Sequence, residues 1–387
     1  MNALHGEQVI AAILKHDTKT TSYKIALLRS INDVVLMYPD MARDDLSVAI
    51  PLRRLAELWV AYYWPFADEL TPIYQGARAI VSGCLRNDIA FRPAVTALKL
   101  EWKRTVQLGV QAGDGFFLHA EMRTPRRRKS YGHALQSAYD KAVAAAGKAL
   151  LMPIKFAGPG HWSIFAQPTR CDQLVDSTRA LPGTQLNELC LVVSGELWAA
   201  FHRLSLYVEA LCIHEWCLFT EGVTQDPARN VTRGEVYTLL TARPDNRRPL
   251  SWERNQIDIL LHENIQFTCP WTQKVISHPQ HYDLDHLLPL TIYPINELWN
   301  LLPVDRQYNQ HTKRDRIPDA SKLAAAEPWL TKAYANYRKL ATLKSAVQED
   351  AMLRFFGLEM IDFEAQLARR AVRFIDEIAT ARFAQRF

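Results

Sequence analysis

The stretch SGELWAAFHRLSLYVEALCIHEWCLFTEG, residues 194–222, limits the possible folds more than any other feature of the chain. Apolar side chains occur on nearly every side of the helix that it would form, and no proline interrupts it. The stretch therefore predicts one long and largely buried helix. A helix of this kind belongs inside a larger packed structure rather than at a surface.

Most of the remaining sequence also predicts helices. In TTSYKIALLRSINDVVLMY, residues 20–38, apolar side chains recur at helical spacing. Pro51 suits the first position of a following helix, and Pro65 ends it. Further helices are expected at 94–108, 131–151 and after Pro318, whereas the Pro and Gly residues of Pro153–Gln167 indicate a small hairpin. The expected fold class is mainly α.

The composition is that of a packed, soluble protein. Of 387 residues, 48% are hydrophobic and 22% are charged, which excludes a disordered chain. The net formal charge is +5, so the chain tolerates a polyanionic partner such as DNA. Six scattered cysteines without a CxxC pair indicate free thiols in a reducing cytoplasm. No apolar run reaches the roughly 18 residues of a membrane span, so a cytoplasmic location without a membrane partner is expected.

The strongest linker signal is ARPDNRRPLS, which ends at Ser251. It combines two prolines, a turn-forming Asp-Asn pair and three arginines. A boundary there predicts a large helical region over residues 1–245 and a small module over 251–320. A C-terminal helical segment, 321–387, is expected to pack on the small module.

Charged residues also gather in RTPRRRKSYGH, residues 123–133, which is expected to be a solvated loop. Its basic side chains could bind the phosphates of nucleic acid, because positive charges on such a segment release counterions when they meet a polyanion. An ordinary charged linker explains the same pattern. The candidate nucleic-acid contacts are Arg126, Arg127, Arg128 and Lys129.

Chemistry is concentrated after residue 266. Short β-rich runs flank a turn at PWTQK, and a second extended run carries Asp283, Asp285 and His286 at its end, so a β-hairpin that leads into a helix is expected. The period of two in a strand places Asp285 and His286 on opposite faces. The two side chains could serve one site only if the strand twists or ends there, which Pro289 favours.

The next residues supply more polar groups. Pro303 with Asp305 is expected to start a helix that carries Asn309 and Lys313 on one face. Hydrolysis of a phosphodiester needs an activated water, neutralisation of the growing negative charge, and help for the departing 3′ oxygen. A histidine such as His286 suits the first task near neutral pH. Mg²⁺ held by one carboxylate and one amide oxygen suits the other two.

The segment resembles the HNH endonuclease family over roughly residues 267–318. The ββα-metal motif of that family has Asp-His before an apolar pair and Pro, then an Asn before a Leu-rich stretch, then an Asn with a Lys soon after. The matching residues here are Asp285-His286-Leu287-Leu288-Pro289, Asn300-Leu301-Leu302-Pro303, and Asn309 with Lys313. The resemblance implies a small ββα nuclease module inside a mainly α chain.

The resemblance also implies roles. His286 would be the general base, Asn300 would stabilise the catalytic motif, and Asp285 with Asn309 would hold a divalent metal. Mg²⁺ is expected, and Mn²⁺ or Ni²⁺ can use the same ligands. Lys313 and Arg314 are expected to contact nucleic acid.

Two departures from the family pattern matter. Many members carry two CxxC pairs that bind zinc, but Cys269 stands alone here, so no structural zinc is expected. Lys313 falls one position later than in the commonest pattern, which weakens its assignment.

The implied activity is metal-dependent hydrolysis of DNA, with nicking and low sequence specificity. The helical segments before residue 245 are similar to those of bacterial HNH proteins found with restriction or anti-phage genes, which implies a defence role in a system such as Zorya, with phage or plasmid DNA as substrate and defence proteins as partners. Two alternatives stay open at this point. One is an RNA-cleaving toxin with the same site, and the other is a nucleic-acid-binding sensor whose site is idle.

Overall fold

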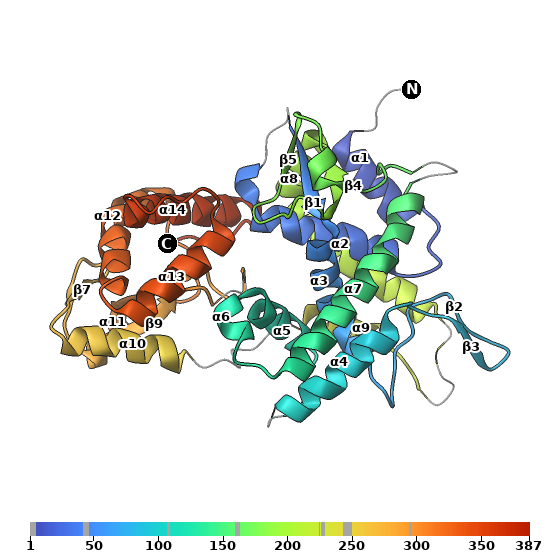
Figure 1. Ribbon diagram of the computed structural model, residues 1–387, viewed down its shortest axis with the longest axis horizontal. Helices are drawn as coiled ribbons and strands as arrows, with labels where there is room; N and C mark the ends of the chain where they lie inside the picture. The colour runs from blue at the N-terminus through green and yellow to red at the C-terminus, as the bar shows by residue number, and fades with distance from the viewer. Residues whose placement is uncertain are drawn as a thin grey trace. The chain divides into compact units, whose positions relative to one another are not determined.

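Figure 1 shows the computed structural model of the chain, which describes residues 5–41, 46–106, 109–158, 163–223, 225, 229–242, 250–293 and 296–387. The chain is mainly helical, as the sequence predicts. It forms two compact units, Met1–Asp245 and Asn246–Phe387, called unit 1 and unit 2 below. The expected linker lies mostly at 243–249, outside the described residues. None of the described helices is long and apolar enough to cross a membrane.

Unit 1 consists of nine α-helices, a four-stranded sheet and a separate hairpin in its described part. The helices are α1 Gly6–Ala11, α2 Tyr23–Met37, α3 Leu52–Tyr63, α4 Arg92–Thr105, α5 Asp114–Arg123, α6 Pro125–Arg128, α7 His133–Phe156, α8 Gly195–Glu221 and α9 Arg233–Thr241. The strands are β1 Ser47–Pro51, β2 Arg78–Val81, β3 Cys84–Asn87, β4 Thr169–Arg170, β5 Thr178–Ala180 and β6 Leu189–Val193.

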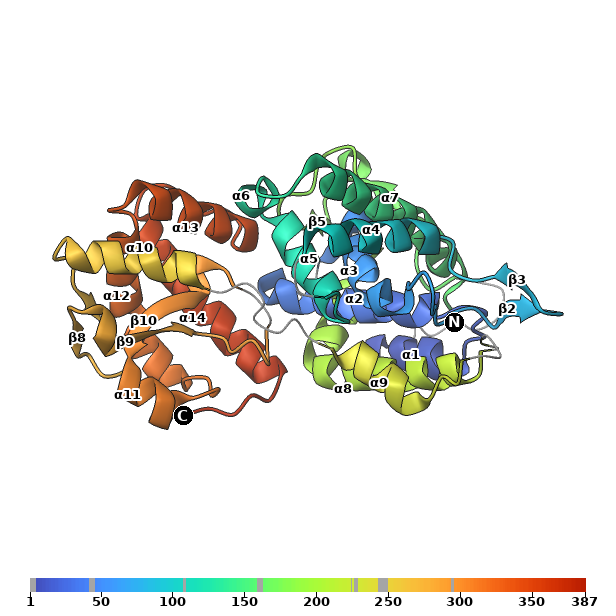
Figure 2. The same cartoon turned by 90° about the horizontal axis from the view of Figure 1, so that it is seen from below.

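The core of unit 1 is built around α2 and α8, which pack side by side (Figure 2). The apolar stretch that predicts one long buried helix is α8. Ser194 caps it by accepting the backbone N–H of Leu197 at 3.3 Å. Helix α2 is buried on almost every side, because α3, α7 and α8 all contact it. Unit 1 is therefore held together by helices that cover one another's apolar faces.

The sheet of unit 1 was not predicted. Its strand order is β4-β6-β1-β5, with β1 antiparallel to β6 and parallel to β5. Each strand has two to five residues, too few to show a clear alternating pattern in the sequence. The separate β2–β3 hairpin turns at Ser82 and Gly83, both with positive φ, and it projects from the rest of unit 1 in Figure 2.

The hairpin expected at Pro153–Gln167 does not form in the described part of that segment. Helix α7 instead continues to Phe156 with Pro153 in its last turn. Proline lacks the N–H that would bond to the carbonyl four residues earlier. Pro153 and Ile154 are both buried, and this burial offsets the lost hydrogen bond.

Unit 2 has two short β-pairs and a set of helices that supports them. Its elements are α10 Ser251–His262, β7 Phe267–Thr268, β8 Val275–Ile276, β9 Tyr282–His286, β10 Leu301–Asp305, α11 Arg306–Tyr308, α12 Ala320–Tyr337, α13 Ala341–Arg354 and α14 Phe363–Ala381. In α12, the Tyr334 hydroxyl donates to the carbonyl of Trp299 at 2.6 Å. In α13, the carboxylate of Asp350 accepts the N–H of Leu298 at 2.9 Å. The C-terminal helices therefore hold the segment that leads into β10.

Candidate active site

The antiparallel pair of β9 and β10 forms the frame of the site. His286 lies opposite Leu301, and Asp285 lies opposite Leu302. The two short runs that flank the turn at PWTQK form an antiparallel hairpin, β7–β8, as the sequence predicts. The run that ends in His286 is not part of this hairpin and pairs with β10. Because β10 comes after β9 in the sequence, the Asp-His pair is held by residues that follow it in the chain.

Pro303 belongs to β10 and does not start a helix, which corrects the sequence prediction. Asp305 is the cap of the next helical turn, where its carboxylate accepts the N–H of Tyr308 at 2.8 Å. Arg306 connects this turn to β9 through an ion pair and a hydrogen bond. Its guanidinium contacts the carboxylate of Asp283 at 3.0 Å and donates to the carbonyl of Tyr282 at 2.9 Å. The turn that carries Asn309 is thereby held against the Asp-His strand.

His286 is held by a residue that the sequence analysis missed. Its Nε2 lies 2.7 Å from the Oδ1 of Asn296. An amide oxygen only accepts hydrogen bonds, so Nε2 carries the proton and the lone pair of Nδ1 is left for chemistry. Burial lowers the pKa of His286, although the Asn296 contact and the charge of Asp285 oppose the shift. The imidazole is therefore neutral at neutral pH, as a general base must be.

The signal that could have identified Asn296 is its position in NELWN, four residues before Asn300. That spacing has no meaning until the fold is known. The loop between β9 and β10 returns Asn296 to the ring of His286, and sequence periodicity does not describe loops.

Asp285 pairs with a buried lysine. Its Oδ2 lies 2.7 Å from Nζ of Lys313, whose side chain is 1% exposed. The same Nζ donates to the carbonyl of His286 at 3.0 Å. Burial raises the pKa of Asp285 above its ordinary value, and the ammonium of Lys313 opposes that shift. Although Asp285 and His286 start on opposite faces of β9, Lys313 contacts both residues.

The position of Lys313 corrects one prediction. It was expected to contact nucleic acid, but its buried ammonium is directed to Asp285 and to the strand backbone. Arg314, the other expected contact, is exposed at the end of the same turn. Of these two cations, Arg314 is therefore the one that is exposed to solvent.

The turn that carries Asn309 and Lys313 is a π-helix, Asn309–Lys313. The N–H of Arg314 donates to the carbonyl of Asn309 at 2.8 Å, which is the five-residue spacing of that helix type. A π turn holds one residue more than an α turn. Lys313 lies one position later than in the commonest HNH pattern, and the wider π turn accommodates this extra residue, so that the lysine still contacts Asp285.

Asn309 has a buried oxygen without a hydrogen-bond partner among the residues that the structure describes, namely its Oδ1. Orphaned buried acceptors are uncommon, because desolvation of an oxygen without a donor costs about 1–3 kcal/mol. A cation would satisfy this oxygen. Asp285, whose carboxylate already meets the positive charge of Lys313, offers a second oxygen donor that suits a cation.

Asn300 is fully buried, and its amide binds the backbone just after β9. Its Oδ1 accepts the N–H of Leu288 at 2.8 Å, and its Nδ2 donates to the carbonyl of Leu288 at 3.1 Å. The carbonyl of Asn300 accepts the N–H of Leu287 at 2.8 Å. Asn300 therefore fixes the path of the chain immediately after His286, and both ends of its amide are used in doing so.

The basic segment of unit 1 is not a solvated loop, which corrects a further prediction. Pro125–Arg128 forms the short helix α6. Arg127 is buried 3.7 Å from a carboxylate oxygen of Glu121, and Arg128 lies 2.5 Å from Asp140. Arg126 is half-buried and Lys129 is exposed. Tertiary packing thus distributes the four cations over different surroundings, and they do not form one free patch.

Two family comparisons match the chain. A family described as a domain of unknown function (DUF8808) matches residues 3–240, and one described as HNH endonuclease matches residues 269–319. The chain belongs to the DUF8808 family and carries an HNH endonuclease domain. No curated protein and no solved structure matches it at a significant level. The HNH match covers the β9–β10 frame and the turn with Asn309, so the site described above lies within the matched residues.

The oxygen donors of the HNH domain suit a hard divalent cation. Within the described ranges, no three His, Cys, Asp or Glu side chains gather closely enough to hold a metal ion. Magnesium does not need such a group, because it keeps several waters and binds through one or two protein oxygens. Asp285 and the orphaned oxygen of Asn309 are donors of that type.

Proposed function

We propose that the chain is a metal-dependent endonuclease that hydrolyses phosphodiester bonds of DNA, one strand at a time and with little sequence preference. The observation that carries the proposal is the state of His286. It is a half-buried, neutral imidazole whose Nε2 is bound to Asn296, and it directly follows the carboxylate of Asp285 in strand β9.

In the proposed reaction, Nδ1 of His286 accepts a proton from the attacking water. The contact with Asn296 holds the ring in the required tautomer. Asp285 and Asn309 would hold the divalent metal, Mg²⁺ by the donor set. When bound, that metal neutralises charge on the phosphate and assists the departing oxygen. The proton on His286 is afterwards released to solvent.

The other residues of the motif position these groups. Asn300 keeps the chain after His286 in place through Leu288. Lys313 holds Asp285 and the backbone of His286. Arg314, which is exposed, is the proposed contact for a phosphate of the bound strand. A single site of this kind handles one strand, so a monomer is expected to nick a duplex.

The direct test is conversion of supercoiled plasmid to open circle by the full chain, with Mg²⁺, Mn²⁺ or EDTA. The variants His286→Ala and Asn309→Ala should lose the activity. His281→Ala is a matched control, because His281 is exposed in the short turn just before the same strand. An RNA substrate in a parallel reaction separates DNA from RNA cleavage. Plasmid that stays supercoiled with every metal, or is nicked equally by His286→Ala, would contradict the proposal.

A role in bacterial defence against phage, in the cytoplasm, is part of the proposal. It is supported by the similarity of the helical segments before residue 245 to those of HNH proteins found with anti-phage genes. The test is phage plating on cells that carry the chain with its neighbouring genes. Protection that depends on His286 is expected, and equal plating on wild-type and His286→Ala cells would contradict it.

A further inference from the structure

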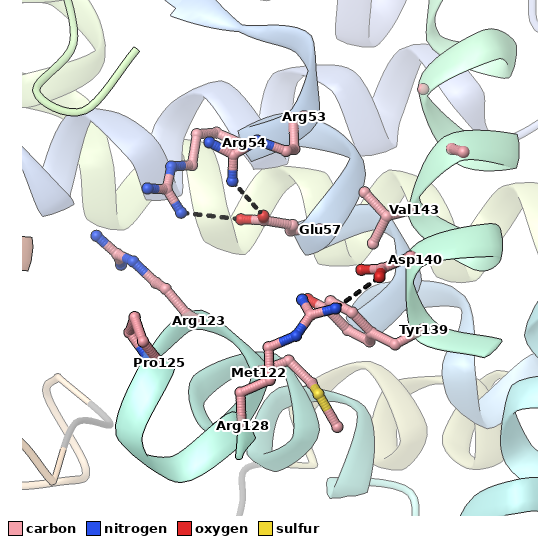
Figure 3. Close-up of a pocket in the computed structure, with 12 residues that line it drawn as sticks. Arg53, Arg54, Glu57, Met122, Arg123, Pro125, Arg128, Tyr139, Asp140 and Val143 are labelled. Atoms are coloured by element: carbon pink, nitrogen blue, oxygen red, sulfur yellow. Dashed lines mark hydrogen bonds and ion pairs between the residues drawn. The ribbon is translucent and has the colours of Figure 1, made fainter. Parts of the chain in front are cut away.

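We propose that unit 1 binds a phosphate ester of about mononucleotide size in an arginine-lined pocket between α3, α6 and α7. The pocket encloses about 570 Å³, and small-molecule sites typically enclose roughly 300–1,000 Å³. Figure 3 shows arginines entering it from two sides, Arg53 and Arg54 from α3, and Arg123 and Arg128 from the α5–α6 segment. None of these residues belongs to the HNH domain, so the proposal is independent of the nuclease site.

The pocket has an excess of positive charge. Four arginines line it, and the carboxylates among its lining residues are those of Glu57 and Asp140. The lining therefore carries a net formal charge of +2. Counting Glu188, which lies 2.7 Å from Arg53 just outside the lining, leaves +1. An anion of one or two charges would balance this arrangement.

The arginines of α3 are held in place before any ligand arrives. Glu57 is buried and accepts Arg53 at 2.9 Å on one oxygen and Arg54 at 3.1 Å on the other. Burial raises the pKa of Glu57, but the neighbouring positive charges, that of Arg54 first, lower it below its ordinary value. The carboxylate is therefore ionised at neutral pH. Preorganised guanidinium groups lose little freedom when they bind a phosphate.

On the opposite side of the pocket, the ion pair between Arg128 and Asp140 is weaker. Arg128 lies 2.5 Å from Asp140, whose side chain is 58% exposed. Exposed ion pairs contribute little to stability, typically about 0–1 kcal/mol. Arg128 can therefore exchange Asp140 for a ligand phosphate at small cost. Asp140 competes with that ligand for the same cation.

The remaining wall is apolar and suits the organic body of a phosphate ester. Met122, Tyr139 and Val143 line it (Figure 3). Gly147 of α7 also lines the pocket, and a Cβ there would meet only the Cβ of Ala56, at 3.9 Å. A larger side chain can therefore be introduced at position 147 without a backbone clash. Charge at one side and apolar groups at the other favour a nucleotide over inorganic phosphate.

The experiment is isothermal titration calorimetry on the full chain in EDTA, which keeps divalent metal from the nuclease site. The probes are AMP, ADP, ATP and inorganic phosphate. A short single-stranded DNA with and without a 5′-phosphate presents the same phosphate ester from a second source. Phosphate-dependent binding of a nucleotide or of the phosphorylated strand is expected, and the arm that binds identifies the source.

Variants test the location. Arg128→Gln should weaken binding about tenfold, the effect of one charge-assisted hydrogen bond. Gly147→Met should block the pocket. Asp140→Asn should tighten binding, because it removes the competitor of the ligand, and misfolding cannot explain a gain. Lys141→Gln removes an exposed charge next to Asp140 but outside the pocket lining, and it should change nothing.

Three results would overturn the proposal. The first is that none of the probes binds. The second is that Asp140→Asn weakens binding, since the pair with Arg128 would then be part of the binding surface and not a competitor. The third is that Arg128→Gln and Gly147→Met both bind as wild type does, since the ligand would then lie elsewhere.

Discussion

Replacement of Asn300 by alanine should loosen the strand that carries the Asp-His pair. The side-chain amide of Asn300 bonds to both the N–H and the carbonyl of Leu288, and both residues are fully buried. After the substitution, two backbone groups of Leu288 lack partners. Each unsatisfied buried group costs about 1–3 kcal/mol, so the expected loss is about 4 kcal/mol.

Hydrogen–deuterium exchange on the full chain measures this loss locally. Peptides that contain Leu287 and Leu288 should exchange on the order of a thousandfold faster in Asn300→Ala, since every 1.4 kcal/mol is a factor of ten. Asn336→Ala is the matched control in unit 2. Asn336 is also buried, and its side-chain amide donates to the carbonyl of Gln266 at 3.0 Å. Its effect should be confined to peptides around Gln266.

An increase of less than about fivefold at Leu287 and Leu288 would refute the reasoning, because it corresponds to under about 1 kcal/mol. The amide of Asn300 would then not be what holds this segment. The same conclusion follows if Asn336→Ala accelerates exchange there as much as Asn300→Ala does.

Three further outcomes follow from the contacts. Lys313→Met leaves the largely buried Asp285 without its cation, so the variant should melt at a lower temperature than wild type. In a thermal-unfolding assay, Mn²⁺ should raise the melting temperature of the variant more than that of wild type. An equal rise would mean that the lysine and the metal do not share Asp285. Asn296→Ala should slow plasmid nicking about 10- to 100-fold while leaving the thermal shift with Mn²⁺ unchanged, because Asn296 contacts the ring of His286 and not the proposed metal ligands. The third outcome concerns Asp68. Burial alone would raise the pKa of Asp68, but hydrogen bonds from the backbone of Thr71 and Leu70 and the charge of Lys99 lower it to about 2. The resulting stability, about 1 kcal/mol after allowance for a side chain that is 39% exposed, is present above pH 3.8 and is lost as the pH falls towards 2. Urea unfolding of Asp68→Asn should show that difference at pH 7 and none near pH 2.

The helices of the chain were predictable because their signals are local. Apolar spacing and the absence of proline identify α8, and α9 begins after Thr232, whose hydroxyl accepts the N–H of Glu235 only three residues later. The order and spacing of the HNH motif is also a property of the sequence. It identified the nuclease domain that the family comparison reports at residues 269–319.

Strand pairing and burial depend on the whole fold. A strand of five residues does not encode its partner, so the pairing of β9 with β10 could not be chosen over the upstream run. Lysine and arginine are usually exposed, and sequence reasoning therefore placed Lys313 and Arg127 at a surface. Tertiary structure buried both, next to Asp285 and Glu121 respectively.

The sequence alone determined the mainly helical fold and the residue types of the nuclease motif, since periodicity and spacing are carried by neighbouring residues. Only the tertiary structure decided what surrounds each of them. It brought Asn296 to His286 across a loop and placed Lys313 in a π turn from which it contacts Asp285. It also set the arginines of α3 opposite those of the α5–α6 segment. These contacts join residues distant in the chain, and the free energy of burial that places them is a sum over the whole packed core.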